Sequence, residues 1–369
     1  MPFGVYVHIP FCARRCDYCD FATWTDRSYL VERYVDACVA DLGRWNDCGV
    51  PAATSVFFGG GTPSLLEPRQ LLRILGAIET ADGAEVTVEC NPDSVDQAKL
   101  AALHGGGVNR VSFGVQSMVP HVLAALGRTH DPHNVERAMA AARSAGFSRV
   151  NVDLVYGAEG ESLGDWQTTL DRALGLRPTH VSAYALTIEA GTPLARRVDS
   201  GEVVPPDDDE QADKYLALDD AMVAAGLEWY EISNWAHPGD ECRHNLLYWH
   251  GGEYLGVGCA AHGHTGGRRW WTVRSPDRYV EAIEAGCSPV AGGEELGFAQ
   301  RADEALALAL RTRFGAEVPA TARVEADELV SEGLLAPRGG RVVLTRRGRL
   351  LASDVTVRVL AAGLPAGTR

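Results

Sequence analysis

A regular alternation of short apolar runs with segments of helical periodicity constrains the fold of this chain more than any other feature. Six runs rich in β-branched and aromatic residues predict buried strands, at residues 4–9, 55–58, 85–89, 110–115, 149–155 and 180–186. Helical periodicity marks the segments between them, at residues 28–45, 67–79, 96–103, 134–145 and 163–174. Such alternation is typical of parallel βαβ units. It predicts an α/β fold, either a full or partial (β/α) barrel or a doubly wound sheet.

The second half of the chain follows a different pattern. The acidic run at residues 207–210 suits the N-terminus of a helix that should reach about residue 225. From residue 300 onward, helices at 301–313 and 324–332 precede a hairpin around residues 338–341, an order that resembles a winged helix. We therefore expect three parts: a barrel over residues 1–192, a middle segment over 193–299, and a winged-helix-like C-terminal domain with a short tail over 300–369.

Charge and composition limit the partners of the chain. With 34 basic and 49 acidic side chains the net charge is −15, which argues against a nucleic-acid binder and favours protein docking for the C-terminal part. No run approaches the roughly 18 apolar residues of a membrane span, and the first ten residues lack a signal-peptide pattern. We expect a soluble cytoplasmic protein without an integral membrane segment.

Three of the nine cysteines form a tight group. Cys12, Cys16 and Cys19 have the spacing C-x3-C-x2-C just after the first predicted strand, which in a barrel is the ligand-binding face. A structural zinc site would need a fourth ligand, for which His8 is nearest, and usually a second C-x2-C pair, which the chain lacks. An iron-sulfur cube held by three cysteines instead leaves one iron for a small molecule with amine and carboxylate groups. The other six cysteines have no ligand spacing.

Further polar residues interrupt the apolar runs that follow. A Gly59-Gly60-Gly61 loop, continued by Thr62, comes after the second strand, where glycine permits close approach to the backbone. Glu89 and Gln116 end the third and fourth predicted strands, and Asp153 lies in the fifth. Arg128, a cation that could pair with a carboxylate, follows Gln116 by twelve residues. Polar groups at the carboxyl ends of barrel strands usually face the binding site.

The cysteine spacing, with Tyr18 before the last cysteine, resembles the signature of the radical S-adenosylmethionine (SAM) enzymes. The resemblance implies a 4Fe-4S cluster on Cys12, Cys16 and Cys19 and a bound SAM whose amino group meets the glycine loop. In that family the reduced cluster passes an electron to the sulfonium of SAM, and the resulting 5'-deoxyadenosyl radical abstracts hydrogen.

Longer strings narrow the resemblance. Two strings resemble the oxygen-independent coproporphyrinogen III oxidases (HemN) and the related HemW haem chaperones: YVHIPFC at the start and HVSAYALTIEAGTPL at the sixth strand. The oxidases act in porphyrin biosynthesis, and the chaperones handle haem. By motif position, the residues that correspond to SAM contacts of the oxidase are Tyr6, Gly60, Gly61, Thr62, Glu89, Gln116, Arg128 and Asp153. Tyr6 would also lie against the cluster.

Three features favour the chaperone branch over the oxidase. Phe21 occupies a position where the oxidase has a further cysteine, and only eleven residues precede Cys12, where the oxidase carries a long extension. The string HNLLYW from His244 to Trp249 resembles a mark of the haem chaperones, and a neutral imidazole is a common axial ligand of haem iron. Four more histidines lie close by in the sequence, and so do two arginines that could bind haem propionates: His237, His250, His262 and His264, and Arg268 and Arg269. The pattern leaves open which histidine binds iron, and whether HNLLYW is instead a structural corner.

The resemblance implies a haem chaperone that binds haem, a 4Fe-4S cluster and SAM, and transfers haem to acceptor proteins such as respiratory cytochromes. The cluster would serve SAM binding, homodimerisation or redox control of transfer, and no sequence feature decides among these. The rival hypothesis is the oxidase, which converts two propionates of coproporphyrinogen III to vinyl groups. A third is another radical SAM reaction on a tetrapyrrole, such as haem degradation.

Overall fold

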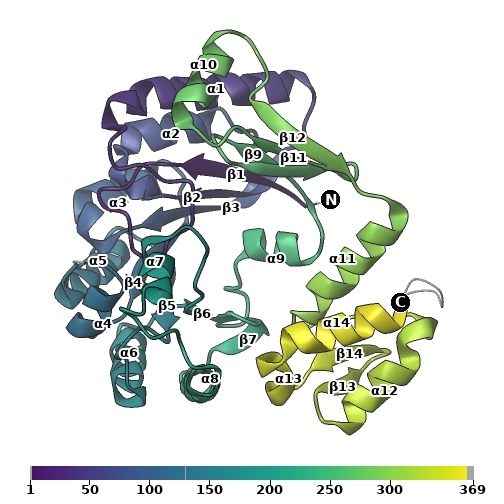
Figure 1. Ribbon diagram of the computed structural model, residues 1–369. Coiled ribbons are helices and arrows are strands. Elements are labelled where there is room, and N and C mark those ends of the chain that lie inside the picture. Colours follow the sequence, from purple (N-terminus) through teal and green to yellow (C-terminus); the bar gives the residue numbers. More distant parts are fainter. Residues whose placement is uncertain (1, 129, 364–369) are drawn as a thin grey trace.

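One large sheet organises the molecule. The computed structural model describes residues 2–128 and 130–363, and within them twelve strands pair in the order β12-β11-β10-β9-β1-β2-β3-β4-β5-β6-β8-β7 (Figure 1). The six central strands are parallel and follow the chain order. They are β1 (Phe3–Ile9), β2 (Ala53–Gly60), β3 (Thr80–Cys90), β4 (Arg110–Gln116), β5 (Arg149–Tyr156) and β6 (His180–Ala185). All six strands predicted from the apolar runs are present.

Helices cover the outer face of this sheet (Figure 1). They are α1 (Val31–Asp47), α2 (Pro68–Gly76), α3 (Gln97–Gly105), α4 (Pro120–Ala125), α5 (Pro132–Ser144), α6 (Leu163–Gly175) and α8 (Asp208–Ala224). The short helix α7 (Pro193–Asp199) lies instead beside the cysteine loop. Single 3₁₀ turns occur at Ser28–Leu30, Pro63–Leu65 and Pro92–Ser94. The five predicted helices correspond to α1, α2, α3, α5 and α6. The acidic run does begin α8, because the Asp207 side chain accepts hydrogen bonds from the first-turn amides of Asp209 and Glu210.

The sheet curves but stays open. Beside β1 lies the parallel strand β9 (Glu253–Val257), followed by the antiparallel strands β10 (His262–Thr265), β11 (Arg268–Thr272) and β12 (Val290–Glu295). At the other edge, β8 (Asn234–Ala236) and β7 (Glu228–Glu231) run antiparallel to β6. In the described residues β12 and β7 each have one neighbour, so the barrel is partial. The fold is the expected partial (β/α)6 barrel rather than a closed barrel.

Two further helices connect strands of the sheet. They are α9 (Arg243–Trp249), between β8 and β9, and α10 (Pro276–Glu284), which lies between β11 and β12 and packs beside α1. The main apolar core lies between the sheet and its outer helices, and it includes Trp166 and Tyr279. A separate apolar cluster of Val119, Val122, Leu186 and neighbours lies where α4 and α7 approach the cysteine loop.

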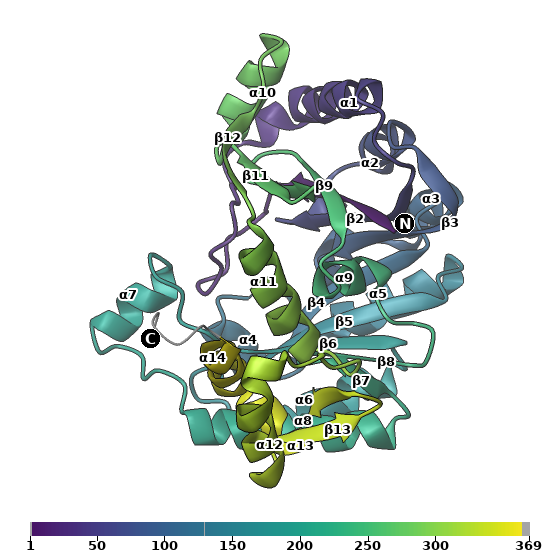
Figure 2. The same cartoon turned by 90° about the vertical axis from the view of Figure 1, so that its right-hand side faces the viewer.

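The C-terminal part has its own core. It contains α11 (Phe298–Leu310), a turn at Ala320–Ala322, α12 (Arg323–Ser331), β13 (Leu335–Arg338), β14 (Arg341–Leu344), α13 (Arg346–Leu350) and α14 (Ala352–Gly363). The hairpin β13-β14 and the two preceding helices agree with the expected winged-helix-like arrangement, whereas α13 and α14 were not predicted. Figure 2 shows this part lying against the β7 and α8 side of the sheet. The division at residues 192 and 299 stays a prediction, and the expected tail falls on residues 364–369, outside the described residues.

Cation contacts fix the C-terminal part to the barrel. Arg349 donates two hydrogen bonds to Asp219 of α8, at 2.8 and 2.7 Å. The guanidinium of Arg311 lies 4.7 Å from the ring centre of Trp249, the last residue of α9. None of the helices in residues 2–128 and 130–363 is both long enough and apolar enough to cross a membrane.

Candidate functional site

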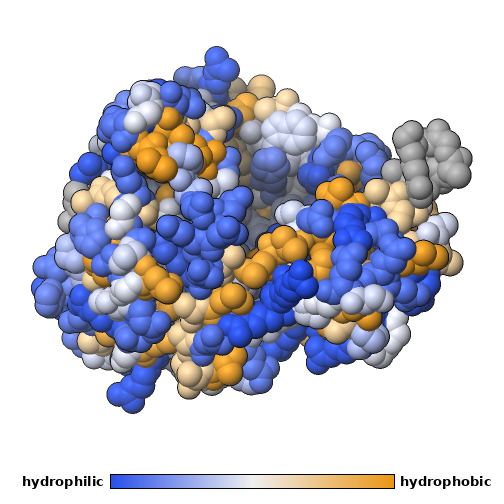
Figure 3. All heavy atoms as spheres, turned by 60° about the horizontal axis from the view of Figure 1, so that its bottom comes forward, coloured by the Kyte–Doolittle hydropathy of each residue, from blue (hydrophilic) through white to orange (hydrophobic). Residues whose placement is uncertain are grey.

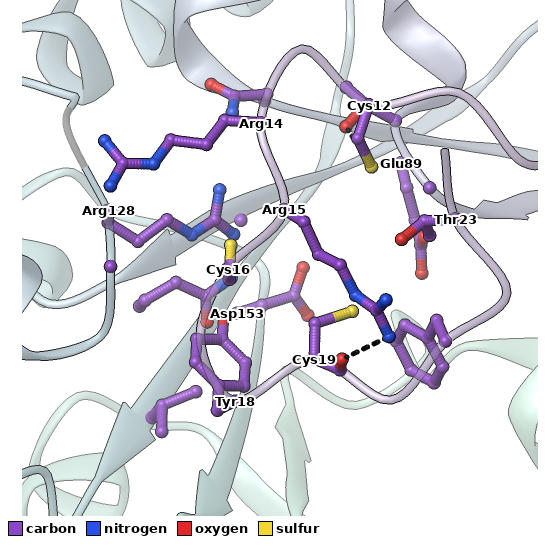
Figure 4. Close-up of a pocket in the computed structure, with 18 of the residues that line it drawn as sticks. Cys12, Arg14, Arg15, Cys16, Tyr18, Cys19, Thr23, Glu89, Arg128 and Asp153 are labelled. Carbon is purple, nitrogen blue, oxygen red and sulfur yellow. Dashed lines mark hydrogen bonds between the residues drawn. The ribbon is translucent and has the colours of Figure 1, made fainter. Parts of the chain in front are cut away.

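A cavity of about 520 Å³ lies at the carboxyl ends of the parallel strands. The cysteine loop forms one wall of it, and the glycine loop and the strand ends form the others (Figure 4). Among its lining residues are eleven of the predicted site residues: Cys12, Cys16, Tyr18, Cys19, Gly60, Gly61, Thr62, Glu89, Gln116, Arg128 and Asp153. Tyr6 and His244 are the two predicted residues that do not line it.

The cysteine loop is held by contacts at both ends and in the middle. The amide of Cys12 donates to the carbonyl of Trp24 at 3.0 Å, and the amide of Trp24 donates to the carbonyl of Pro10 at 2.8 Å. Tyr18 packs on the apolar cluster near α4 and α7, and the amide of Leu194 donates to the carbonyl of Asp17 at 2.9 Å. These hydrogen bonds and the packing of Tyr18 fix the shape of the loop.

The three cysteines fit an iron-sulfur cluster better than a single metal ion. All are free and half-buried, and Figure 4 shows their sulfur atoms around one common space. Across the described part of the chain, no three His, Cys, Asp or Glu side chains are close enough together to hold one ion. A cube with one cysteine on each of three irons does not need the sulfurs to meet at a point. Burial raises the pKa of the Cys12 and Cys19 thiols, and the neighbouring Cys16 adds to the rise, so a cationic centre is needed to hold them as thiolates.

His8 does not complete a zinc site. Its Nε2 lies 2.9 Å from the carbonyl oxygen of Ala22, and its Nδ1 lies 3.0 Å from the hydroxyl of Tyr6. With both ring nitrogens occupied, His8 is a support of the cysteine loop. Tyr6 consequently reaches the loop through His8 and lines a smaller inner chamber of about 240 Å³. The two cavities share five lining residues, namely Phe21, Gly60, Glu89, Asp153 and Tyr184.

The glycine loop packs closely on the cysteine loop. The amides of Gly61 and Thr62 donate to the carbonyls of Ile9 and Phe11, both at 2.8 Å. A Cβ on Gly61 would lie 2.7 Å from each of these two carbonyl oxygens, so glycine is required there by protein packing. The Thr62 hydroxyl lies 3.7 Å from the Cys12 sulfur, which ties the two loops together beside the cavity.

Two carboxyl groups form an acidic side of the cavity. Burial raises the pKa of Glu89 to about 8, and the neighbouring Asp153 adds to the rise, although the Gly60 amide donates to Glu89 at 3.1 Å. Burial also raises the pKa of Asp153, against hydrogen bonds from Ser112 at 2.6 Å and Asn151 at 2.8 Å. Two carboxyls that share a desolvated space favour a cationic ligand, such as one with ammonium and sulfonium groups.

The end of β4 is strained beside this acidic side. Gln116 is buried and has φ of +64°, a conformation that costs a non-glycine residue free energy and that gathers at functional sites. A Cβ on Gly114 would meet the side chains of Gln116 and Arg128 at 3.0 and 3.1 Å. Arg128 thus lies against β4 and lines the cavity.

The structure does not support His244 as an exposed haem ligand. His244 is 1% exposed, its Nδ1 lies 2.9 Å from the hydroxyl of Ser55 on β2, and its Nε2 lies 2.9 Å from the hydroxyl of Tyr248. Its ring also stacks on Phe57 at 5.4 Å. Burial lowers the pKa of His244 to about 3. Both ring nitrogens of His244 are hydrogen-bonded within the fold, so HNLLYW joins α9 to the sheet in this structure, and His244 as the haem ligand stays a prediction.

Sequence reasoning missed the apolar rim of the cavity. Phe21, Tyr184 and Leu65 line it and are 60, 43 and 36% exposed, which is unusual for such side chains. Tyr184 ends β6, so the rule that placed Glu89 and Asp153 could also have found it. Arg14 and Arg15 lie on the same wall, and Arg15 donates to the carbonyl of Cys19 at 3.1 Å (Figure 4).

Comparison with known proteins agrees with this geometry. The model of the Radical SAM superfamily matches residues 6–173. A heme chaperone HemW of Mycobacterium tuberculosis is 45% identical over 97% of this chain and 95% of its own length, and that of Bacillus subtilis is 32% identical over 95% and 97%. The solved coproporphyrinogen III oxidase (HemN) of Escherichia coli superposes with a TM-score of 0.85 at 21% identity, over 97% of this chain and 90% of that chain, which shows a common fold. The chain belongs to the radical SAM superfamily and, within it, to the family of the HemW proteins.

Proposed function

We propose that this protein is a haem chaperone: it binds haem and passes it to acceptor proteins. The observation that carries the proposal is the similarity over nearly the whole length to relatives named heme chaperone HemW. Respiratory cytochromes are natural acceptors, and a cluster-dependent homodimer and a cytoplasmic location are parts of the same proposal.

The proposal includes a 4Fe-4S cluster on Cys12, Cys16 and Cys19 and a SAM molecule beside it. The shape of the cysteine loop and its half-buried thiols support the cluster. The raised pKa values of Glu89 and Asp153 support a cationic ligand in the same cavity. A reduced cluster supplies an electron when present. The chain's own residues hold the loop, through Thr62 and His8, and exclude water from the carboxyls.

Coproporphyrinogen oxidase activity is the rival function. The solved oxidase is only 21% identical to this chain, so its similarity supports a common fold and does not by itself support a common activity. Phe21 argues against it, because an exposed aromatic ring stands at the cavity where the oxidase has a further cysteine.

Two assays on the anaerobically reconstituted protein test the proposal. Titration with ferric protoporphyrin IX should give a saturable Soret band, and the absence of saturable binding would refute the chaperone. Incubation with coproporphyrinogen III, SAM and reductant should leave the substrate unchanged, whereas accumulation of protoporphyrinogen would establish the oxidase instead.

The cluster is tested separately by Cys16→Ser. This variant should lose iron and the broad visible absorption after reconstitution, with Cys48→Ser, an exposed cysteine outside the loop, as the matched control. Equal iron content in the two variants would contradict the ligand assignment.

A further inference from the structure

We propose that haem binds across the mouth of the main cavity, with its porphyrin face on the apolar rim and one propionate at Arg14. The apolar rim consists of Phe21, Leu65 and Tyr184. This proposal rests on the haem binding proposed above, and it names the place on the molecule where that binding occurs.

Three separate segments of the chain form the apolar rim. Phe21 lies two residues after the last cysteine of the cysteine loop, Leu65 ends the turn that follows the glycine loop, and Tyr184 lies near the end of β6. All three line the cavity of about 520 Å³. Phe21 and Tyr184 also line the inner chamber of about 240 Å³, so they lie at the boundary between the two spaces.

Packing of the fold does not account for these three side chains. Phe21, Leu65 and Tyr184 are 60, 36 and 43% exposed, and none of them belongs to an apolar cluster of the described residues. The other large apolar side chains that the structure shows as exposed, such as Phe298 and Val357, line neither cavity. One exposed apolar side chain is ordinary, but three gathered at one cavity indicate a ligand with a broad apolar surface.

The shape of the rim suits a porphyrin. Two of its three side chains are aromatic, and such rings pack favourably on other flat π systems. The volume of the cavity is in the usual range of small-ligand sites, about 300–1,000 Å³. Because the proposed cluster and SAM occupy its interior, a tetrapyrrole must lie across its mouth. Figure 3 shows the molecule hollowed between the barrel and the C-terminal part, so the open side of the sheet can be approached from solvent.

A basic group is available beside the rim. Arg14 and Arg15 are exposed and line the same cavity. Arg15 donates to the carbonyl of Cys19, whereas the Arg14 side chain has no hydrogen bond or ion pair with any residue that the structure describes. Figure 4 shows the guanidinium of Arg14 pointing away from Cys12 and Cys19. A haem carboxylate can therefore pair with Arg14 without displacing a contact of the fold.

Acidic groups limit the assignment to one propionate. Three exposed carboxylates line the same cavity, namely Asp20, Asp93 and Glu189. Their negative charges oppose a second haem carboxylate inside the cavity, so the other propionate stays in solvent.

The arginine pair that the sequence offered for propionates lies elsewhere. Arg268 and Arg269 belong to β11 and line neither cavity. Arg269 donates to Glu294 at 3.0 Å and to Glu304 at 2.5 Å, so its charge is already paired. Arg14 is therefore the better partner for a propionate.

The first test measures the rim with two tetrapyrroles. Ferric protoporphyrin IX and, separately, iron-free protoporphyrin IX are titrated into the reconstituted full-length protein; the iron-free compound reports packing of the ring without axial ligation. Phe21→Ala and Tyr184→Ala should each bind both compounds about tenfold more weakly, because each loses a ring that the porphyrin would cover. Phe298→Ala, 84% exposed and outside both cavities, is the matched control and should bind as the wild type does.

Circular dichroism and iron content verify folding and the cluster in each variant. Tyr184 lies outside the cysteine loop, so Tyr184→Ala keeps the test decisive even if Phe21→Ala loses iron.

The second test measures the propionate contact. Arg14→Gln should weaken binding of ferric protoporphyrin IX about two- to fivefold and leave binding of its dimethyl ester, which has no free carboxylate, unchanged. Arg278→Gln, an exposed arginine of α10 outside both cavities, is the matched control and should bind both compounds as the wild type does.

Wild-type affinity for both tetrapyrroles in Phe21→Ala and Tyr184→Ala would overturn the proposed haem site and leave the chaperone function intact. So would a wild-type protein that binds only the iron-containing compound, because an iron ligand rather than the rim would then carry the binding. An equal effect of Arg14→Gln on haem and on its dimethyl ester would refute the propionate contact. Absence of any saturable Soret band in the wild type would overturn the proposed function itself, so these failures are distinguishable.

Discussion

Replacement of Glu89 by glutamine should stabilise the empty protein while it weakens SAM binding. The pKa of Glu89 rises from its ordinary 4.5 to about 8 because the carboxyl is buried beside Asp153. Between these two pH values the folded chain keeps a proton that the unfolded chain has released. The free energy of unfolding therefore decreases as pH rises through this window, by at most about 1.4 kcal/mol per pH unit. Glutamine has the same shape and no charge, so Glu89→Gln removes this decrease.

Thermal unfolding from pH 5 to pH 8 measures the effect. The thermal midpoint of Glu89→Gln, measured relative to that of the wild type, should increase by on the order of 2 °C for each unit by which the pH is raised. SAM binding should change in the opposite direction, because a cationic ligand binds the ionised carboxylate. With a pKa of about 8, the ionised fraction of Glu89 grows about tenfold from pH 6 to pH 7, a range in which the α-amino group of SAM stays largely protonated, so wild-type affinity should rise about tenfold over this range.

Glu189→Gln is the control, because Glu189 lines the same cavity but is exposed. Calorimetric titration with SAM should show a flat pH profile for Glu89→Gln and a wild-type profile for Glu189→Gln. The reasoning is refuted if wild-type affinity is constant between pH 6 and pH 7, or if Glu89→Gln loses its midpoint advantage as pH rises.

Three other substitutions test the packing around the site. Gly61→Ala should cost about 1–3 kcal/mol in urea unfolding, since its Cβ would meet two backbone oxygens at 2.7 Å, whereas Gly43→Ala on α1, with nothing within 4 Å, should not destabilise. His244→Ala should cost about 2–4 kcal/mol yet leave haem bound per folded molecule unchanged; a selective loss of haem would restore His244 as the ligand. Arg349→Leu should lower the free energy of the first unfolding transition by about 1–3 kcal/mol, because the buried Asp219 loses two charged hydrogen bonds and keeps only its contacts with Arg346 and Trp235; equal stability in urea would show that the C-terminal part docks by other contacts.

Local patterns predicted the site better than they predicted its ligands. Cys12, Glu89 and Asp153 were placed correctly at one cavity because the ends of parallel strands meet at one edge of the sheet. The glycine loop was predicted because glycine lets a ligand approach the backbone. At Gly61 the structure shows another reason: two carbonyl oxygens of the protein itself leave no room for a side chain.

The sequence by itself determined that six strands alternate with helices and that the cysteine loop follows the first strand, because periodicity and motif spacing are properties of neighbouring residues. Only the tertiary structure decided the order of the strands in one open sheet and the hydrogen bonds of the His244 ring. Ser55 and His244 are 189 residues apart in the chain, and their hydrogen bond turns a candidate ligand into a support of the fold.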